Sequence, residues 1–220
     1  MKTKARYIRL VLTPSAIAVL FLFLSFSPSK PSEETARKYE MVLQESSQMF
    51  VRVQTNVNEF CCDFTDQSRF ENVAFTGVFK PTGVDFDNAI LRLPVSNFDC
   101  GKELINKDFR QLLNPDDCSD FIKVEFVRAT WQNFGKDSSD HFNPKSGFFE
   151  MKFTVAGVET FKKAQINNPK VGTRNFSCKG EVDIDIREFG LEPPTKFMNL
   201  IKVSETIQIS FDLDMRGKYS

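Results

Sequence analysis

Cysteine is the residue type in this sequence best suited to covalent chemistry, and the chain has five: Cys61, Cys62, Cys100, Cys118 and Cys178. A thiolate zinc site usually has Cys-x-x-Cys spacing, which is missing here, so we expect disulfides and no metal site. We predict a bond between Cys100 and Cys118. Either Cys61 or Cys62 is a candidate partner for Cys178, but not both, because neighbouring strand residues point to opposite faces. At least one thiol stays free.

The single histidine, His141, is the other candidate for catalysis. One histidine excludes a multi-histidine metal site and leaves one possible base for a Ser-His-Asp or Cys-His mechanism. His141 lies in the turn-rich stretch 137–144, where no nucleophile or orienting partner is nearby. Asp183 and Asp185 share one strand face and could bind a cation, although a solvated face is the simpler interpretation. We therefore predict no catalytic residue, no cofactor and no enzymatic activity.

The composition limits the class of partner. Twenty-nine basic and 29 acidic residues give a formal net charge of zero over 220 residues, which argues against a nucleic-acid binder. Apolar residues make up 41% of the chain, as in a folded globular protein. The 24 phenylalanines far outnumber the three tyrosines and one tryptophan. Since Phe has no polar group, these residues predict a large apolar interior.

The first 27 residues predict an export signal or an N-terminal membrane anchor. Four cations precede the apolar run Ala16–Leu24, as in a secretory signal. Cleavage and retention as an anchor both stay open. Residues 28–48 begin with Pro and polar residues and are interpreted as a linker, and residues 49–217 as the folded domain.

Apolar and polar residues alternate with a period of two through most of this domain, which predicts β-strands. The expected strands cover 50–65, 70–79, 87–96, 121–131, 147–156, 158–167, 173–186 and 202–216. A change of parity near Asn58 and Glu59 indicates a β-bulge in the first strand. Lys102–Leu113 has helical spacing and predicts one short helix. The prediction is an all-β fold, an eight-stranded antiparallel barrel with one helix.

An eight-stranded barrel can be filled by its own side chains or can hold one small ligand. The inward faces of three expected strands would line such a lumen. The predicted lining residues are Phe149, Met151, Phe153, Phe176, Val182, Ile184, Ile207, Ile209 and Phe211.

Several segments also resemble the YceI-like family. The most specific is the turn Arg187-Glu-Phe-Gly-Leu191 within Gly180–Pro194. The others are Thr55–Cys61, Leu93–Gly101, Lys107–Leu113, Ile122–Phe126 and Ile201–Phe211. The resemblance implies an exported bacterial protein with a lipocalin-like barrel around an apolar cavity that holds a polyisoprenoid or another lipid.

Together these observations predict an exported lipid-binding protein, periplasmic or anchored to the membrane on the periplasmic side. Its partner would be a polyisoprenoid or fatty-acid type of lipid in the barrel lumen. The alternative is a structural or interaction module of the cell envelope with the same barrel and a filled core.

Overall fold

The computed structural model describes residues 36–66, 68–71, 73–114, 120–132, 144–193, 195–196 and 201–218. The predicted signal or anchor, Cys118 and His141 lie outside these ranges. Within the described ranges, no helix is long and apolar enough to cross a membrane.

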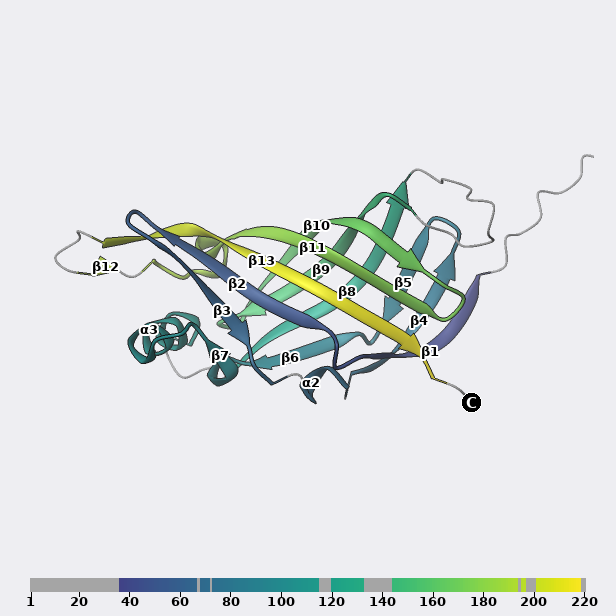
Figure 1. The fold of residues 1–220 in the computed structure, drawn as a ribbon, viewed down its shortest axis with the longest axis horizontal. Coiled ribbons are helices and arrows are strands. Elements are labelled where there is room, and N and C mark those ends of the chain that lie inside the picture. Colours follow the sequence, from purple (N-terminus) through teal and green to yellow (C-terminus); the bar gives the residue numbers. More distant parts are fainter. Residues whose placement is uncertain are drawn as a thin grey trace, which may run out of the picture. The chain divides into compact units, whose positions relative to one another are not determined.

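Eight strands form a closed antiparallel ring (Figure 1). In order around the ring they are β1 (Arg37–Leu43), β4 (Ala74–Lys80), β5 (Gly83–Asp87), β8 (Phe121–Gln132), β9 (Ser146–Val155), β10 (Val158–Val171), β11 (Asn175–Asp185) and β13 (Ile201–Gly217). The pairing of β1 with β13, from Met41 opposite Gly217 to Leu43 opposite Met215, closes the ring. The prediction of an antiparallel barrel with an eight-stranded ring is confirmed.

The long strand β13 also pairs with a second set of strands outside the ring. Its earlier part pairs with β2 (Gln48–Thr55), which continues through β3 (Glu59–Phe64) to β7 (Phe98–Asp99). The strand β6 (Ile90–Pro94) pairs with β8, and β12 (Thr195–Lys196) with β13. Short helical turns are α2 (Ser68–Glu71), η1 (Val95–Asn97) and η2 (Ile186–Phe189), while α3 (Glu103–Leu113) is the predicted helix.

Alternation along the strands builds the core as predicted. In β9 every second residue from Gly147 to Val155 is buried, and the residues between them are partly exposed. The same pattern runs through β11 and the second half of β13. Because successive side chains of a strand point to opposite faces, this one pattern gives each strand an apolar inner face and a polar outer face.

Two of our predictions are wrong, one on where the barrel begins and one on a β-bulge. The strand β1 lies within residues 28–48, which we assigned to a linker, so the barrel includes residues from Arg37 onward. Only Met41 and Leu43 of this strand are buried, and such a short apolar signal is hard to distinguish from a polar linker. The predicted bulge near Asn58 is instead the turn of a hairpin between β2 and β3. A bulge and a hairpin turn have the same effect on the sequence pattern, because each changes whether the odd- or the even-numbered residues that follow point inward.

Candidate functional site

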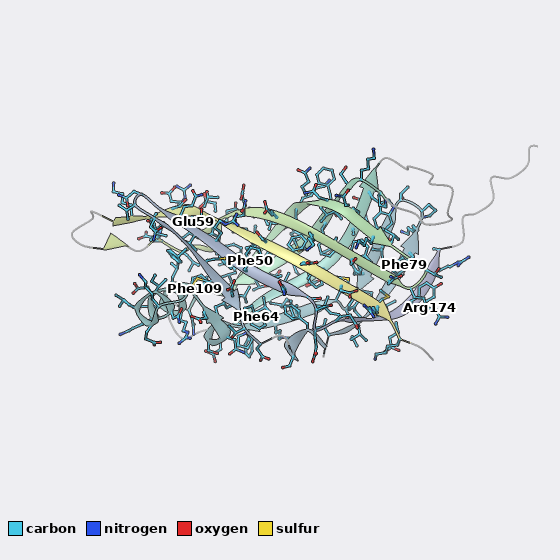
Figure 2. The ribbon with its side chains drawn as sticks, in the orientation of Figure 1. Phe50, Glu59, Phe64, Phe79, Phe109 and Arg174 are labelled. Atoms are coloured by element: carbon cyan, nitrogen blue, oxygen red, sulfur yellow. A yellow bond between two sulfur atoms is a disulfide. The ribbon has the colours of Figure 1, made fainter. Side chains whose placement is uncertain are left out.

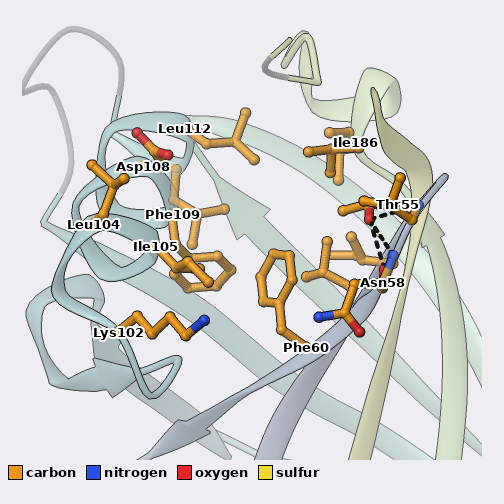
Figure 3. Close-up of a pocket in the computed structure, with 15 residues that line it drawn as sticks. Thr55, Asn58, Phe60, Lys102, Leu104, Ile105, Asp108, Phe109, Leu112 and Ile186 are labelled. Carbon is orange, nitrogen blue, oxygen red and sulfur yellow. Dashed lines mark hydrogen bonds between the residues drawn. The ribbon is translucent and has the colours of Figure 1, made fainter. Parts of the chain in front are cut away.

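An apolar pocket of about 520 Å³ lies between α3 and one end of the barrel (Figure 3). Fifteen residues line it, and eleven of them are apolar. The apolar ones are Val53, Val57, Phe60, Leu104, Ile105, Phe109, Leu112, Leu113, Ile186, Val203 and Ile207. The polar ones are Thr55, Asn58, Lys102 and Asp108. This composition and volume are those of a small-molecule site, which is typically 300–1,000 Å³ and mostly apolar.

The helix α3 forms one wall because its apolar stripe is wider than its contact with the barrel. Phe109 and Leu113 are buried, whereas Ile105 and Leu112 are only partly buried and line the pocket. Leu104, also in the lining, is 70% exposed. Residues three and four positions apart lie on the same side of a helix, so this spacing places the side chains together.

A chain of aromatic rings fixes α3 against the barrel. The ring of Phe109 lies 5.5 Å from that of Phe98 in β7, and Phe98 lies 5.3 Å from Phe64 in β3, measured between centroids. Figure 2 marks Phe64 and Phe109 on their elements. All three rings are buried, so the inner edge of α3 packs as part of the core.

The opposite wall comes from the hairpin β2–β3, from β13 and from η2. Val53 and Phe60 belong to the two strands of the hairpin, Val203 and Ile207 to β13, and Ile186 begins η2. Figure 3 shows the Phe60 ring facing Ile105 and Phe109 across the pocket. The pocket thus lies between the helix α3 and a wall formed by segments that are far from it in the sequence.

A disulfide between Cys62 and Cys100 joins these two walls. It links β3 to the segment that leads into α3. The predicted pairing of Cys100 with Cys118 is therefore wrong, and so is a pairing of Cys62 or Cys61 with Cys178, because Cys61 and Cys178 are free thiols. The reason is the pairing of β3 with β7, in which Phe64 lies opposite Phe98 and so brings Cys62 near Cys100.

The segment after the disulfide is held by an asparagine. The backbone N–H of Cys100 donates to Asn106 Oδ1 at 2.6 Å, and Asn106 Nδ2 donates to Asp99 Oδ1 at 3.0 Å. The Asn106 side chain and the Gly101 N–H hydrogen-bond Asp99 and lower the pKa of its carboxyl. These bonds fix the start of α3, and with it the position of Lys102 at the edge of the pocket.

The two free thiols differ in exposure. Cys61 is exposed, and partial desolvation together with the nearby Asp63 raises the pKa of its thiol. Cys178 is buried in the core, which raises the pKa of its thiol strongly. A raised pKa lowers the thiolate fraction, so neither thiol has the environment of a reactive cysteine.

Two solved structures share this fold across most of the chain. BcnA of Burkholderia cenocepacia has a TM-score of 0.53 at 12% identity, over 78% of this chain and 98% of its own. A polyisoprenoid-binding domain from Saccharophagus degradans has a TM-score of 0.51 at 10% identity, over 82% and 99%. The YceI protein of Campylobacter jejuni matches at 13% identity with a TM-score of 0.41, over 66% and 81%. The chain has the fold of the first two of these structures.

Comparison of the sequence with protein-family models gives no match, and comparison with curated proteins gives none either. The similarity to BcnA and to the polyisoprenoid-binding domain is therefore one of fold, found in the arrangement of strands.

Within this barrel, the nine residues predicted to line a lumen are all buried. Their position on the inner faces of β9, β11 and β13 is as predicted, and their role as ligand contacts stays a prediction. Only Ile207 also lines the pocket beside α3. Phe149 packs against the rings of Phe126, Phe86, Phe211 and Phe176, with centroids 5.3, 5.6, 5.9 and 6.2 Å away.

Of the residues predicted to line a ligand site, only Ile207 lines this pocket. The spacing predicts the helix Lys102–Leu113 but assigns it no part in a binding site. The available signal was the width of its apolar stripe, since Leu104, Ile105, Leu112 and Leu113 cover more surface than one packing face needs. Phe60 was placed on the inner face of the first strand, and the hairpin instead positions it at the pocket.

The other predicted positions form no metal-binding cluster in the described part of the chain. No group of three His, Cys, Asp or Glu residues there could hold a metal ion. Asp185 forms an ion pair with Arg187 at 2.6 Å, and Asp183 accepts a hydrogen bond from Gln208 at 3.3 Å. These carboxylates thus interact with neighbouring side chains on the outer surface.

Proposed function

We propose that this chain is an exported lipid-binding protein that holds an isoprenoid or acyl chain in the apolar pocket beside α3. The observation that carries the proposal is the pocket itself, about 520 Å³ with eleven apolar residues among its fifteen. No covalent chemistry and no catalytic residue are part of the proposal.

Burial of an apolar chain would supply the binding energy. Each buried methylene contributes roughly 0.8 kcal/mol, so about ten of them contribute about 8 kcal/mol. Association costs on the order of 4–15 kcal/mol, so a short chain binds weakly and a longer one binds stably. The same face of β13 continues from Ile207 in the pocket to Ile209, and the proposed chain ends before Phe211, whose ring packs against Phe149.

Two further observations support the proposal. The Saccharophagus degradans domain with the same fold is described as polyisoprenoid-binding. The Cys62–Cys100 disulfide is typical of an oxidising compartment, as expected for an exported protein. Whether the N-terminal segment is cleaved or anchors the protein stays open in this proposal.

The test is native mass spectrometry of the full chain, purified from bacteria that export it. We expect an added mass that disappears after organic extraction and returns when farnesol or palmitate is supplied. A protein without added mass that takes up neither compound would contradict the proposal.

The packing around Phe149 favours the alternative, an interaction module of the cell envelope with a filled core. Four aromatic rings surround Phe149, so side chains occupy the interior at this level of the barrel. The pocket beside α3 lies outside this aromatic cluster, since none of its five rings is in the lining. The uptake experiment separates the two functions, because a filled module takes up no lipid.

A further inference from the structure

The four polar residues of the α3 pocket are not equally available to a ligand. Thr55 Oγ1 donates to the backbone carbonyl of Asn58 at 2.7 Å and accepts from the Asn58 N–H at 2.8 Å. It also accepts from the Val57 N–H at 3.2 Å. The hydroxyl is therefore committed to the hairpin turn, as the dashed lines of Figure 3 show.

Asn58 keeps a donor for the pocket. Its Oδ1 accepts a hydrogen bond from the Glu59 N–H at 2.8 Å, which also orients the side-chain amide. The Nδ2 group is then the end directed toward Phe60 in Figure 3. An amide nitrogen only donates hydrogen bonds, so this group suits an acceptor oxygen.

Lys102 supplies a charge at the same end of the pocket. Figure 3 shows its ammonium group on the other side of Phe60 from Asn58, pointing into the space between α3 and the hairpin. Lys102 has no ion pair within the part of the chain that the structure describes, although fourteen other ion pairs are found there. An ammonium group has three donors and no acceptor.

The acidic residue of the lining lies elsewhere. Asp108 follows Lys102 by six residues, which corresponds to about 9 Å along a helix at about 1.5 Å per residue. In Figure 3 it lies beyond Leu104, near Leu112. The end of the pocket near Phe60 thus presents two donor groups, the Asn58 amide and the positively charged Lys102 ammonium. No carboxylate of the lining lies there to neutralise that charge.

We propose that the pocket selects amphiphiles with an anionic head, a phosphate or a carboxylate, which binds at the end of the pocket near Phe60 through the Lys102 ammonium and the Asn58 amide. The apolar chain then lies along Phe60 and Ile105. This inference rests on the proposed lipid-binding function and names the class of lipid. Charge-assisted hydrogen bonds are about twice as strong as neutral ones, so the head group decides between lipids with the same chain.

The experiment compares pairs of lipids that share a chain. The full-length protein is loaded with the neutral fluorophore N-phenyl-1-naphthylamine, which is displaced by farnesyl phosphate, farnesol, palmitate or hexadecanol. We expect each anion to bind about tenfold more tightly than its alcohol, the effect of one charge-assisted hydrogen bond. A preference seen only with farnesyl phosphate identifies a phosphate head, and one seen only with palmitate identifies a carboxylate.

Variants assign the preference to these side chains. Lys102→Met is expected to reduce the preference from about tenfold to about twofold, and Lys102→Arg to keep it. Asn58→Asp keeps the oxygen that accepts from Glu59 but replaces the donor with a carboxylate, so anions should bind about tenfold more weakly. Lys107→Met is the matched control, because Lys107 is exposed on α3 and does not line the pocket.

Equal affinity for anion and alcohol in the unmodified protein would overturn the inference and leave the proposed function in place. The same holds for a preference that persists in both Lys102→Met and Asn58→Asp. If no lipid displaces the fluorophore and native mass spectrometry finds no uptake, the proposed function itself fails.

Discussion

Cys62 in β3 is bonded to Cys100, which precedes Lys102 by two residues and the start of α3 by three. Phe60, which faces the helix across the pocket, precedes Cys62 by two residues in the same strand. The disulfide therefore covalently connects the two walls of the pocket next to the residues that we propose contact the ligand.

Removal of this disulfide is expected to destabilise the protein. The bond spans 38 residues, and a loop of this size corresponds to about 4 kcal/mol in the chain-entropy model. Urea denaturation of Cys62→Ala/Cys100→Ala should show a free energy of unfolding lower by about 2–4 kcal/mol. Cys61→Ser is the matched control, because Cys61 is the exposed neighbour in the same strand. An equal loss in that variant would show that the disulfide is not the cause.

A larger side chain in the wall of the pocket should block lipid uptake. Ile105 is partly buried and lines the pocket from α3, so Ile105→Trp would extend an indole into the space of the ligand. We expect binding of farnesol to weaken at least about tenfold, as loss of about two methylene contacts would cause. Gln111→Trp places the same group on an exposed position of α3 outside the lining. If displacement titrations show unchanged farnesol binding in Ile105→Trp, this pocket is not the site where the lipid binds.

Gly180 should not tolerate a side chain because of Phe211. The two residues lie opposite each other in β11 and β13, and a Cβ at position 180 would be 2.5 Å from Phe211 Cζ and 2.8 Å from the Gln165 carbonyl oxygen. Gly180→Ala is expected to lower the free energy of unfolding by about 1–3 kcal/mol, through displacement of the ring.

A double-mutant cycle tests the role of that ring. Phe211→Ala alone should lower the free energy of unfolding by about 3–5 kcal/mol. Gly180→Ala should lower the free energy of unfolding by less in that background, since the contacts with the Phe211 ring are gone while the Gln165 carbonyl stays close. Urea denaturation of the four proteins gives the coupling energy, and strict additivity would mean that Phe211 does not set the need for glycine.

Acid should remove one electrostatic contribution to the stability of the folded state, made by Asp185 at the start of η2. Asp185 accepts hydrogen bonds from the side chain and the backbone N–H of Arg187, which lower its pKa to about 2 from an ordinary value of 3.8. Because the pKa in the folded state lies below that of the unfolded chain, the contribution is present above pH 3.8 and is lost as the pH falls toward 2. Asp185→Asn should therefore lower the urea midpoint at pH 7 and have a smaller effect near pH 2.5.

The partner of Asp185 provides the control. In an Arg187→Gln background, the side-chain bonds are absent, so the pH-dependent effect of Asp185→Asn should shrink. A midpoint difference that stays constant from pH 7 to pH 2.5 would contradict the assignment.

Much of the fold could be predicted from sequence because strand faces are a local property. Side chains alternate along any extended backbone, so residues such as Phe149, Phe176 and Phe211 are assigned to the interior without knowledge of their partners. The helix at residues 103–113 follows from spacing in the same way. The antiparallel class then follows from the many strands and their short connections, but the members of the ring do not. The ring contains β1 and β5, where no strand was expected, whereas the expected strands 50–65 and 87–96 correspond to β2–β3 and β6 outside it.

The candidate site could not be predicted in this way, because each of its parts depends on a contact between distant segments. A parity change at Asn58 fits a bulge or a hairpin equally well, and only the pairing of β2 with β3 distinguishes them. The partner of Cys100 depends on β3 lying beside β7. The sequence determined which side chains are apolar and which face of each element they share. The tertiary structure decided that one apolar side of α3 lies opposite Phe60 and leaves a space between them, since local periodicity contains no information on the distance between two elements.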